Sequence, residues 1–161
     1  MTVGAAIRRA ARADVPALLG LIRGLAEYER LTPLVTATED GLAETLFGTQ
    51  ANAEALLAEV DGEPVGFALY FHNMSTFLGR RGLYLEDLFV LPSHRRRGIG
   101  KALLAECARI AHKRSCGRFE WMALDWNTPA IEFYKSLGAS EMAEWRLFRM
   151  TGDALARLAR S

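Results

Sequence analysis

Two adjacent carboxylates, Glu86 and Asp87, interrupt an apolar run at residues 83–90. Burying a charge costs free energy unless that charge is paired or serves a function. A partly desolvated carboxylate such as Glu86 can bind the ammonium group of a substrate and then help to remove its proton. The alternative is structural, with solvent at the strand end or nearby arginines satisfying both charges. Alternation along a strand predicts that Asp87 shares a face with Leu85 and Phe89, opposite to the face of Glu86.

A basic turn follows this run and has the composition of an anion site. Arg95, Arg96 and Arg97 precede Gly98 and Gly100, which open an amphipathic helix. The free N–H groups and the positive dipole end of a helix start attract anions, and glycine lets a phosphate approach the backbone closely. The spacing is neither the dinucleotide fingerprint nor the Walker pattern. It predicts a diphosphate site, with a solvated basic turn as the alternative.

The overall composition predicts one globular domain over residues 1–161. Half of the 161 residues are hydrophobic, which is ordinary for a domain of this length. Lys plus Arg number 20 against 19 Asp plus Glu. We expect no nucleic-acid partner, because nucleic-acid binders usually carry a larger positive excess. No apolar stretch is long enough for a signal peptide or a membrane span. We therefore expect a cytoplasmic protein without membrane association.

The cysteines and histidines predict neither a metal centre nor a covalent nucleophile. Cys107, Cys116 and the three histidines are scattered, without metal-ligand spacing. Cys107 falls on the apolar stripe of the helix after Gly98, which predicts burial as a small hydrophobe. Because neither cysteine has a plausible base partner, we expect no covalent intermediate and no metal.

Local patterns predict the elements that must position these residues. Asp14 is a candidate helix cap, Thr36 begins a capping-box signature, Gly62 lies in a hairpin turn and Gly138 closes a helix. In chain order the expected elements are a strand at 5–10, a helix from Asp14 to 27–29, a helix from Thr36 to Gly48, strands at 55–60 and 64–71, a loop at 72–82, a strand at 83–90, a helix after Gly98, a strand at 119–124, a helix at 129–137, strands near 139–143 and 145–150, and a last turn or two of helix.

The order β-α-α-β-β-β-α-β-α-β-β defines the expected fold class. Consecutive antiparallel pairs followed by crossover helices predict an α/β mixed sheet with helices on both faces.

A second constellation lies around Tyr134. By itself, a tyrosine in an amphipathic helix is usually a core residue with a hydrogen-bonded hydroxyl. Here Asn127 precedes the helix, and Phe133-Tyr134 is followed by Gly138-Ala139. Together with the 95–100 turn, this pattern resembles the GNAT superfamily of N-acetyltransferases and implies its acyl-CoA acyltransferase fold. Within that superfamily, the chain is similar to the diamine acetyltransferases, which comprise the spermidine/spermine and thialysine acetyltransferases. The stretches that carry this similarity are residues 25–29, 84–90, 126–127, 133–135 and 145–148.

The resemblance implies roles for individual residues, acetyl-CoA as co-substrate and a homodimer. Tyr134 would be the general acid that protonates the leaving thiolate, and Glu86 would lie at the substrate amine. Tyr28, Glu29 and Glu144 would contribute to substrate binding. The expected cofactor-binding residues are Leu88, Phe89 and Val90 at the acetyl-pantetheine, Arg95, Arg96, Arg97, Gly98, Ile99, Gly100 and Lys101 at the diphosphate, and Asn127, Thr128, Pro129 and Ala130 along the remainder.

The expected activity is acetyl-CoA-dependent N-acetylation of a small cationic primary amine, either a polyamine or a thialysine-like amino acid. A neutral amine attacks the thioester directly in a ternary complex, and backbone N–H groups stabilise the oxyanion. Two alternatives stay open: acetylation of protein lysines or N-termini, and a non-catalytic acyl-CoA sensor.

Overall fold

The computed structural model describes residues 4–161. These residues form two compact units, one ending at Met122 and the other running from Ala123 to Ser161. The expectation of one domain over 1–161 stays a prediction.

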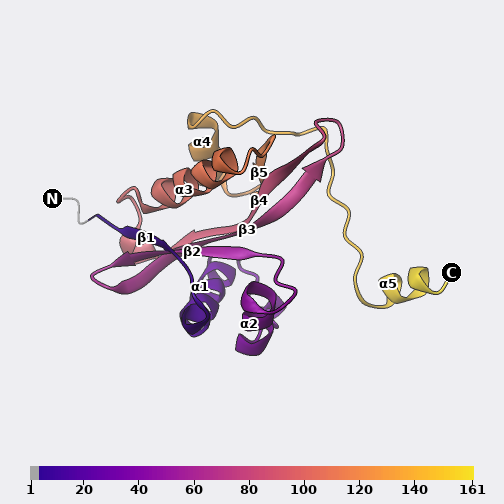
Figure 1. Cartoon of the computed structure of the whole chain (residues 1–161), viewed down its shortest axis with the longest axis horizontal. Coiled ribbons are helices and arrows are strands. Elements are labelled where there is room, and N and C mark those ends of the chain that lie inside the picture. Colours follow the sequence, from indigo (N-terminus) through magenta and orange to yellow (C-terminus); the bar gives the residue numbers. More distant parts are fainter. Residues whose placement is uncertain (1–3) are drawn as a thin grey trace. The chain divides into compact units, whose positions relative to one another are not determined.

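The first unit is built on a five-stranded mixed sheet, in the order β1-β2-β3-β4-β5 (Figure 1). The first four strands pair antiparallel, and β5 runs parallel to β4. The strands are β1 (Ala6–Arg9), β2 (Glu54–Val60), β3 (Glu63–Ser75), β4 (Arg80–Val90) and β5 (Phe119–Trp121). The predicted mixed α/β sheet is confirmed.

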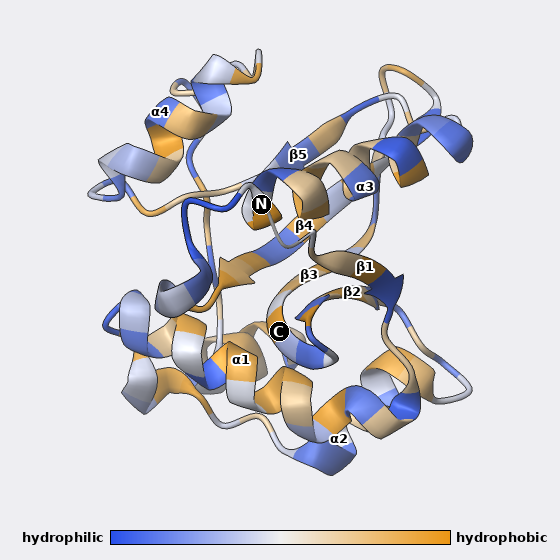
Figure 2. Cartoon of the chain, turned by 90° about the vertical axis from the view of Figure 1, so that its left-hand side faces the viewer, coloured by the Kyte–Doolittle hydropathy of each residue, from blue (hydrophilic) through white to orange (hydrophobic). Residues whose placement is uncertain are grey.

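Helices cover both faces of this sheet, as predicted. The helices are α1 (Val15–Tyr28), α2 (Glu39–Phe47) and α3 (Ile99–Lys113). Helices α1 and α2 lie on one face and α3 on the other (Figure 1), and Figure 2 shows α1 and α2 as alternating apolar and polar bands, as expected of amphipathic helices. The buried core on the α1–α2 face contains Leu18, Leu21, Leu46, Ala55, Leu57, Phe67 and Phe89. Helix α3 buries Leu103, Leu104 and Cys107, so the predicted burial of Cys107 is confirmed.

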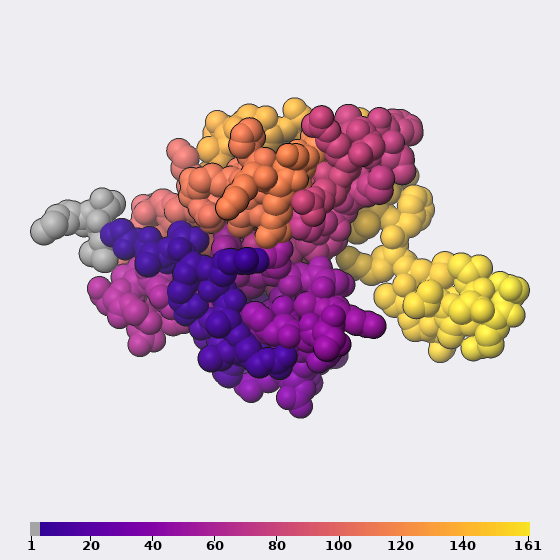
Figure 3. Space-filling view, in the orientation of Figure 1, coloured from indigo at the N-terminus to yellow at the C-terminus, as the bar shows by residue number. Residues whose placement is uncertain are grey.

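Ion pairs supplement the backbone pairing of the first strand with β2. Most of β1 is exposed, and Figure 3 shows these indigo residues at the surface. Arg8 forms ion pairs with Asp14, at 2.8 Å, and with Glu59 of β2, at 2.6 Å. These bonds hold the pKa of Arg8 above and that of Asp14 below the usual values. Asp14 precedes α1 as predicted, but its carboxylate accepts the Ala11 N–H at 2.7 Å instead of capping the helix.

The start of α2 differs from the prediction by a few residues. Its N-cap is Thr38, whose Oγ1 accepts the Gly41 N–H at 3.1 Å. Thr36 is therefore not the cap. With Thr38 as the cap, Glu39 and Asp40 lie in the first turn of α2, where their carboxylates interact favourably with the helix dipole. The predicted end at Gly48 is confirmed.

Hairpins dominate the centre of the sheet. The β2–β3 turn places Asp61 and Gly62 at φ 52° and 81°, and Val60 pairs with Glu63. This two-residue turn with two left-handed residues confirms the predicted hairpin. The predicted loop at 72–82 is wrong, because β3 and β4 continue to pair as far as Ser75 and Arg80. Backbone pairing extends the strands here without the apolar alternation that sequence patterns detect.

Strand β5 ends at Trp121, three residues before the predicted end, after pairing with Leu83, Tyr84 and Leu85 of β4.

The second unit contains α4 (Thr128–Ser136) and α5 (Gly152–Ala159). Helix α4 ends as predicted at a left-handed Gly138, with φ 94°. The Gly138 N–H donates to the Lys135 carbonyl at 3.0 Å, and the Ala139 N–H donates to the Tyr134 carbonyl at 3.2 Å. This is the Schellman pattern of helix termination. The predicted short terminal helix is confirmed as α5.

The two strands predicted near 139–143 and 145–150 do not form in the described chain. The apolar alternation is present, but a strand exists only where a neighbouring strand completes its hydrogen bonds. The side chains of Trp145 and Phe148 are exposed by 75% and 90%. This segment therefore presents an apolar surface that nothing in its own unit buries.

Candidate functional site: a carboxylate cluster beside an anion-binding loop

A β-bulge at Glu86 shapes the first unit's candidate site. Asp87 pairs with Leu69 of β3, whereas Leu85 pairs with the next β3 residue, Tyr70. One β3 step therefore spans two β4 steps, and Glu86 is the extra residue. Neighbouring β3 residues point to opposite faces, and directly paired residues share a face. The bulge thus places Asp87 and Leu85 on opposite faces of the sheet.

The prediction that Asp87 and Leu85 share a face of the sheet is therefore wrong. Asp87 shares its face with Phe89, which belongs to the cluster packed under α1, and with Leu69, which packs against that cluster. Plain alternation fails because a bulge adds one residue to the period of two. Glu86 is exposed at the bulge, and Asp87 is half-buried.

Asp87 is the carboxylate with the strongly perturbed proton affinity. Its pKa is raised to about 7, first by burial and then by repulsion from Glu86 and Glu29. Burial also raises the pKa of Glu29, which directly follows α1. The predicted acceptor residues Glu29 and Glu86 are thus within electrostatic reach of Asp87. Sequence reasoning did not choose Asp87 as a site residue, although its position beside Glu86 in an apolar strand was the available signal.

The C-terminal end of α1 lies against the end of β4. A Cβ on Gly24 would come within 3.0 Å of the Phe89 ring, so the glycine permits close packing of α1 on β4. One turn later, the Tyr28 ring lies under the Arg95 guanidinium, with 4.3 Å from Cζ to the ring centroid. Arg95 Nε also donates to the Val90 carbonyl at 3.0 Å. The predicted acceptor residue Tyr28 and the predicted cofactor residue Arg95 are therefore in contact.

The loop before α3 has the shape expected of an anion-binding turn. Arg96 and Gly98 are left-handed, with φ of 61° and 76°, and Arg96 and Arg97 are exposed. The first N–H groups of α3 have no carbonyl partner within the helix. A Cβ on Gly100 would touch Val90 Cγ2 at 3.9 Å, an ordinary contact distance. The packing therefore does not require glycine at position 100, and the glycine leaves the backbone open to close approach by a ligand.

The outer edge of β4 is available to a ligand beyond Leu85. In the described part of the first unit, β5 pairs with β4 at Leu83, Tyr84 and Leu85 and no further. The backbone of Leu88, Phe89 and Val90 pairs with β3 along the other edge. Acetyl-CoA therefore fits the residues present: a strand edge for its pantetheine arm and a glycine-bearing helix start for its diphosphate.

The other predicted residues lie in the second unit. Asn127 immediately precedes α4, which contains Thr128, Pro129, Ala130 and Tyr134. The Tyr134 ring packs on Phe133, with ring centroids 5.6 Å apart. Glu144 lies in the exposed segment between α4 and α5. The roles predicted for these residues stay predictions.

Cysteine thiols and metal-ligating side chains are the other groups that could carry chemistry. Both cysteines are free, and burial raises the pKa of Cys107 to about 12. A thiol in that state is a poor nucleophile. Among the described residues, no group of three or more His, Cys, Asp and Glu side chains is arranged to hold a metal ion.

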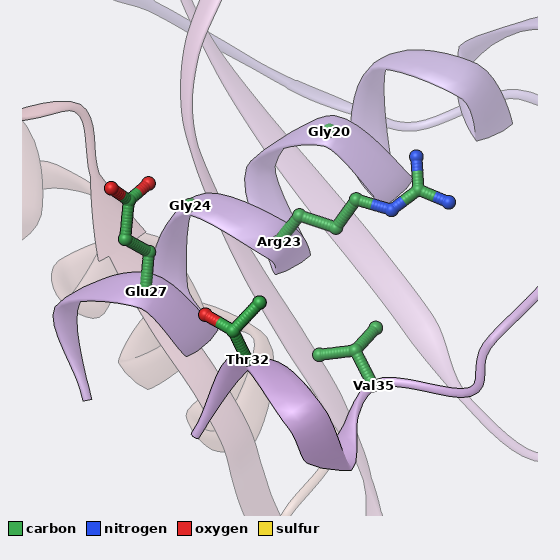
Figure 4. A pocket seen from close by; sticks show the side chains of 6 residues that line it. All are labelled: Gly20, Arg23, Gly24, Glu27, Thr32 and Val35. Atoms are coloured by element: carbon green, nitrogen blue, oxygen red, sulfur yellow. The ribbon is translucent and has the colours of Figure 1, made fainter. Parts of the chain in front are cut away.

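A separate pocket of about 550 Å³ opens beside α1 (Figure 4). Its lining residues are Gly20, Arg23, Gly24, Glu27, Thr32 and Val35. Figure 4 shows Thr32 and Val35 pointing toward α1. The lining includes none of the predicted acceptor residues of the first unit, so the pocket is distinct from the carboxylate cluster.

Comparison with known proteins identifies the family. The family model described as "Acetyltransferase (GNAT) family" matches residues 22–139. The chain belongs to the GNAT acetyltransferase family. The predicted GNAT N-acetyltransferase is thereby confirmed, and the matched range contains the carboxylate cluster, the 95–100 loop and Tyr134.

Two relatives place the chain within the GNAT family. Thialysine N-epsilon-acetyltransferase from Sus scrofa is 39% identical over 95% of this chain and 96% of its own length. L-ornithine N5-acetyltransferase NATA1 from Arabidopsis thaliana is 37% identical over 92% of this chain and 85% of its own length. The predicted similarity to the thialysine acetyltransferase group is confirmed.

A solved structure supports the GNAT fold. An integron cassette protein from the mobile metagenome of V. cholerae superposes with a TM-score of 0.82 and 32% sequence identity, covering 98% of each chain.

In residues 4–161, no helix has the length and apolar character needed to cross a bilayer.

Proposed function

We propose that this protein transfers the acetyl group of acetyl-CoA to a primary amine of a small cationic acceptor, by direct attack in a ternary complex. The acceptor class is a diamine, a polyamine or a basic amino acid of the thialysine or ornithine type. The observation that carries the proposal is the cluster of Glu29, Glu86 and Asp87, in which Asp87 has a pKa of about 7.

The carboxylate cluster suits a cationic amine for electrostatic reasons. Glu29 and Glu86 repel the ionised form of Asp87, so a positive charge brought among them is favourable to all three. Binding an ammonium group lowers the pKa of Asp87 and stabilises its ionised form. An acceptor with two cationic groups gains more than one with a single group, because several carboxylates are available.

The same carboxylates provide a path for the proton. A lysine-like amine has a pKa of about 10.4 and arrives protonated at neutral pH, yet only the neutral amine has a lone pair for attack. A base with a pKa near the working pH is well suited to accept that proton. We assign the first proton transfer to Glu86 or Asp87, directly or through water, and the final acceptor is solvent.

The cofactor side of the reaction is assigned to the 95–100 loop, the outer edge of β4 and Tyr134. Acetyl-CoA, when bound, supplies an acyl group activated as a thioester. The amine nitrogen bonds to the acetyl carbon as the carbon–sulfur bond breaks. Backbone N–H groups at the β4 edge stabilise the negative charge that develops on the acyl oxygen, and the Tyr134 hydroxyl donates a proton to the departing sulfur.

The proposal includes a homodimer in the cytoplasm. Apolar side chains that nothing in the second unit buries, among them Trp145, Leu147 and Phe148, favour burial against a further surface, which we assign to a second copy of the chain. Two free thiols suit a reducing compartment. Sedimentation at several concentrations tests the dimer, and a monomer at every concentration would contradict it.

A screen of amine acceptors tests the proposed function. Thialysine, ornithine, lysine, spermidine and putrescine are compared with a peptide carrying a free N-terminus and a lysine, and release of CoA thiol is measured. We expect one or more of the small amines to have the highest kcat/KM. Glu86→Gln and Asp87→Asn should lower that value, whereas Glu63→Gln, at the exposed β2–β3 turn, is the matched control. Preference for the peptide, or no acetylation of any amine, would overturn the proposal.

A further inference from the structure

Arg95 extends from the loop before α3 to the end of α1. Its guanidinium lies over the Tyr28 ring at 4.3 Å and near the Phe89 ring at 5.5 Å. Its Nε donates to the carbonyl of Val90, the last residue of β4, at 3.0 Å. One half-buried side chain therefore contacts α1, β4 and the loop that carries it.

These contacts link the two halves of the proposed site. Tyr28 is the last residue of α1, and the next residue, Glu29, belongs to the carboxylate cluster that acts on Asp87. On the other side, Arg95 begins the turn that leads to Gly98 and the α3 N-terminus. Movement of Tyr28 should therefore shift Arg95 and the loop, and movement of the loop should shift the end of α1 next to Glu29.

The loop needs such an anchor because its backbone is unfavourable. Arg96 adopts φ 61°, a left-handed conformation that is unfavourable for a residue other than glycine. Surrounding contacts must hold it in place. A planar guanidinium that stacks on one ring and bonds a backbone carbonyl fixes the residue immediately before Arg96.

We propose that Arg95 is a positioning residue that couples the cofactor loop to the acceptor pocket through the Tyr28 ring. This inference rests on the proposed function for the identity of the two ligands. Arg95 acts by holding the loop and the end of α1 in their binding arrangement, rather than by contacting the diphosphate itself. Removing the Tyr28 ring should then weaken CoA binding although Tyr28 lies outside the loop.

The test is a double-mutant cycle on CoA affinity, measured by calorimetry without any acceptor. Arg95→Gln and Tyr28→Leu should each raise the Kd of CoA by about threefold to thirtyfold, the range for loss of one cation–π contact. The Kd of CoA for the double variant should be no higher than the higher Kd of the two single variants, because both changes break the same contact. Tyr28→Phe, which keeps the ring, should bind CoA like the wild type.

Two further variants separate positioning from charge. Arg97→Gln removes one positive charge from an exposed position in the same loop, and its effect on the Kd should add to that of Tyr28→Leu. Arg95→Lys keeps the charge and the attraction to the ring but lacks the planar group, so it should restore part of the affinity. Thermal melts verify that each variant is folded. If Tyr28→Leu does not fold, Tyr28→Met, which also lacks the ring, takes its place in the cycle, and Arg95→Met, which keeps the aliphatic part of the side chain and lacks the guanidinium, takes the place of an unfolded Arg95→Gln.

Clear outcomes overturn this inference. Unchanged CoA affinity in a folded Tyr28→Leu protein, or additive effects of Arg95→Gln and Tyr28→Leu, would show that the contact of Arg95 with the Tyr28 ring does not position the loop. Because the cycle needs only CoA, a wild type that binds CoA but acetylates no amine would defeat the proposed function and leave this result intact. A wild type that does not bind CoA would defeat both.

Discussion

Asp87 lies opposite Leu69 in the β3–β4 ladder, so that a carboxylate faces the same side of the sheet as the apolar cluster under α1. The bulge at Glu86 produces this arrangement by adding one residue to β4. Two neighbouring carboxylates thereby have different surroundings, one exposed and one half-buried. Different surroundings give chemically similar groups different proton affinities, which is a common basis for acid–base work.

The activity should depend on the ionisation of Asp87. Its pKa of about 7 in the free protein predicts that kcat/KM rises with pH through about 7, because the ionised carboxylate binds the ammonium group. Asp87→Asn should lower kcat/KM and remove this rise. Glu86→Gln and Glu29→Gln should each move the rise to lower pH, because both carboxylates raise the pKa of Asp87. A rise that stays in place in Asp87→Asn would assign the titration to another group.

The free energy of unfolding should fall as the pH rises, in the opposite direction to kcat/KM. The pKa of Asp87 is higher in the folded protein than in the unfolded chain, so the folded state holds this proton more tightly. The resulting stabilisation is complete below about pH 4 and is lost as the pH rises toward 7. Urea titrations should show Asp87→Asn to be more stable than wild type at pH 8, by roughly 1–3 kcal/mol. Equal stability of the two proteins at pH 8 would contradict the burial of this charge.

The two loop glycines should separate the demands of folding from those of the ligand. Gly98 is left-handed, so Gly98→Ala should destabilise the fold by roughly 1 kcal/mol. Gly100 is helical and has room for a Cβ, so Gly100→Ala should leave the melting temperature unchanged or raise it. We nevertheless expect Gly100→Ala to weaken CoA binding, as measured by calorimetry. Wild-type affinity in that variant would place the diphosphate elsewhere.

Tyr134 is expected to act as the general acid. Tyr134→Phe retains the ring and its contact with Phe133 and removes only the hydroxyl group. Loss of a positioned proton donor typically lowers the rate by roughly 10²- to 10⁴-fold. Single-turnover kinetics should show this loss in the chemical step, while the affinity for CoA stays close to that of wild type. A chemical step within twofold of wild type would exclude the role.

The elements that sequence predicts well are those specified by local chemistry. Asp61-Gly62 allows the tight turn of the β2–β3 hairpin, and Gly138 supplies the left-handed residue that ends α4. Helices α1 and α3 are predicted by apolar residues that recur with the helical period. Each of these signals lies within a few residues of the structure that it produces, so neither a partner strand nor a distant contact is needed.

The features that sequence does not reveal depend on pairing. The bulge at Glu86 is defined by its β3 partners, and the extension of β3 to Ser75 and of β4 back to Arg80 is defined by the pairing of the two strands. The contact of Arg95 with Tyr28 joins residues far apart in the chain, so spacing within the 95–100 loop could only assign Arg95 to the anion site. The segment at 139–150 has the apolar alternation typical of two strands, but its own unit contains no strand with which it pairs.

The attachment of β1 gives one sheet two different responses to salt. The core strands are held by apolar burial, which excluded salts such as sulfate strengthen. Strand β1 pairs with β2 through its backbone and is held in addition at Arg8 by two carboxylates near the surface, an attraction that dissolved ions screen. Added salt of this kind should therefore strengthen the apolar centre of the sheet while it weakens the ion-pair part of the attachment of β1. Amide hydrogens of β1 should exchange faster under conditions in which those of β3 exchange more slowly.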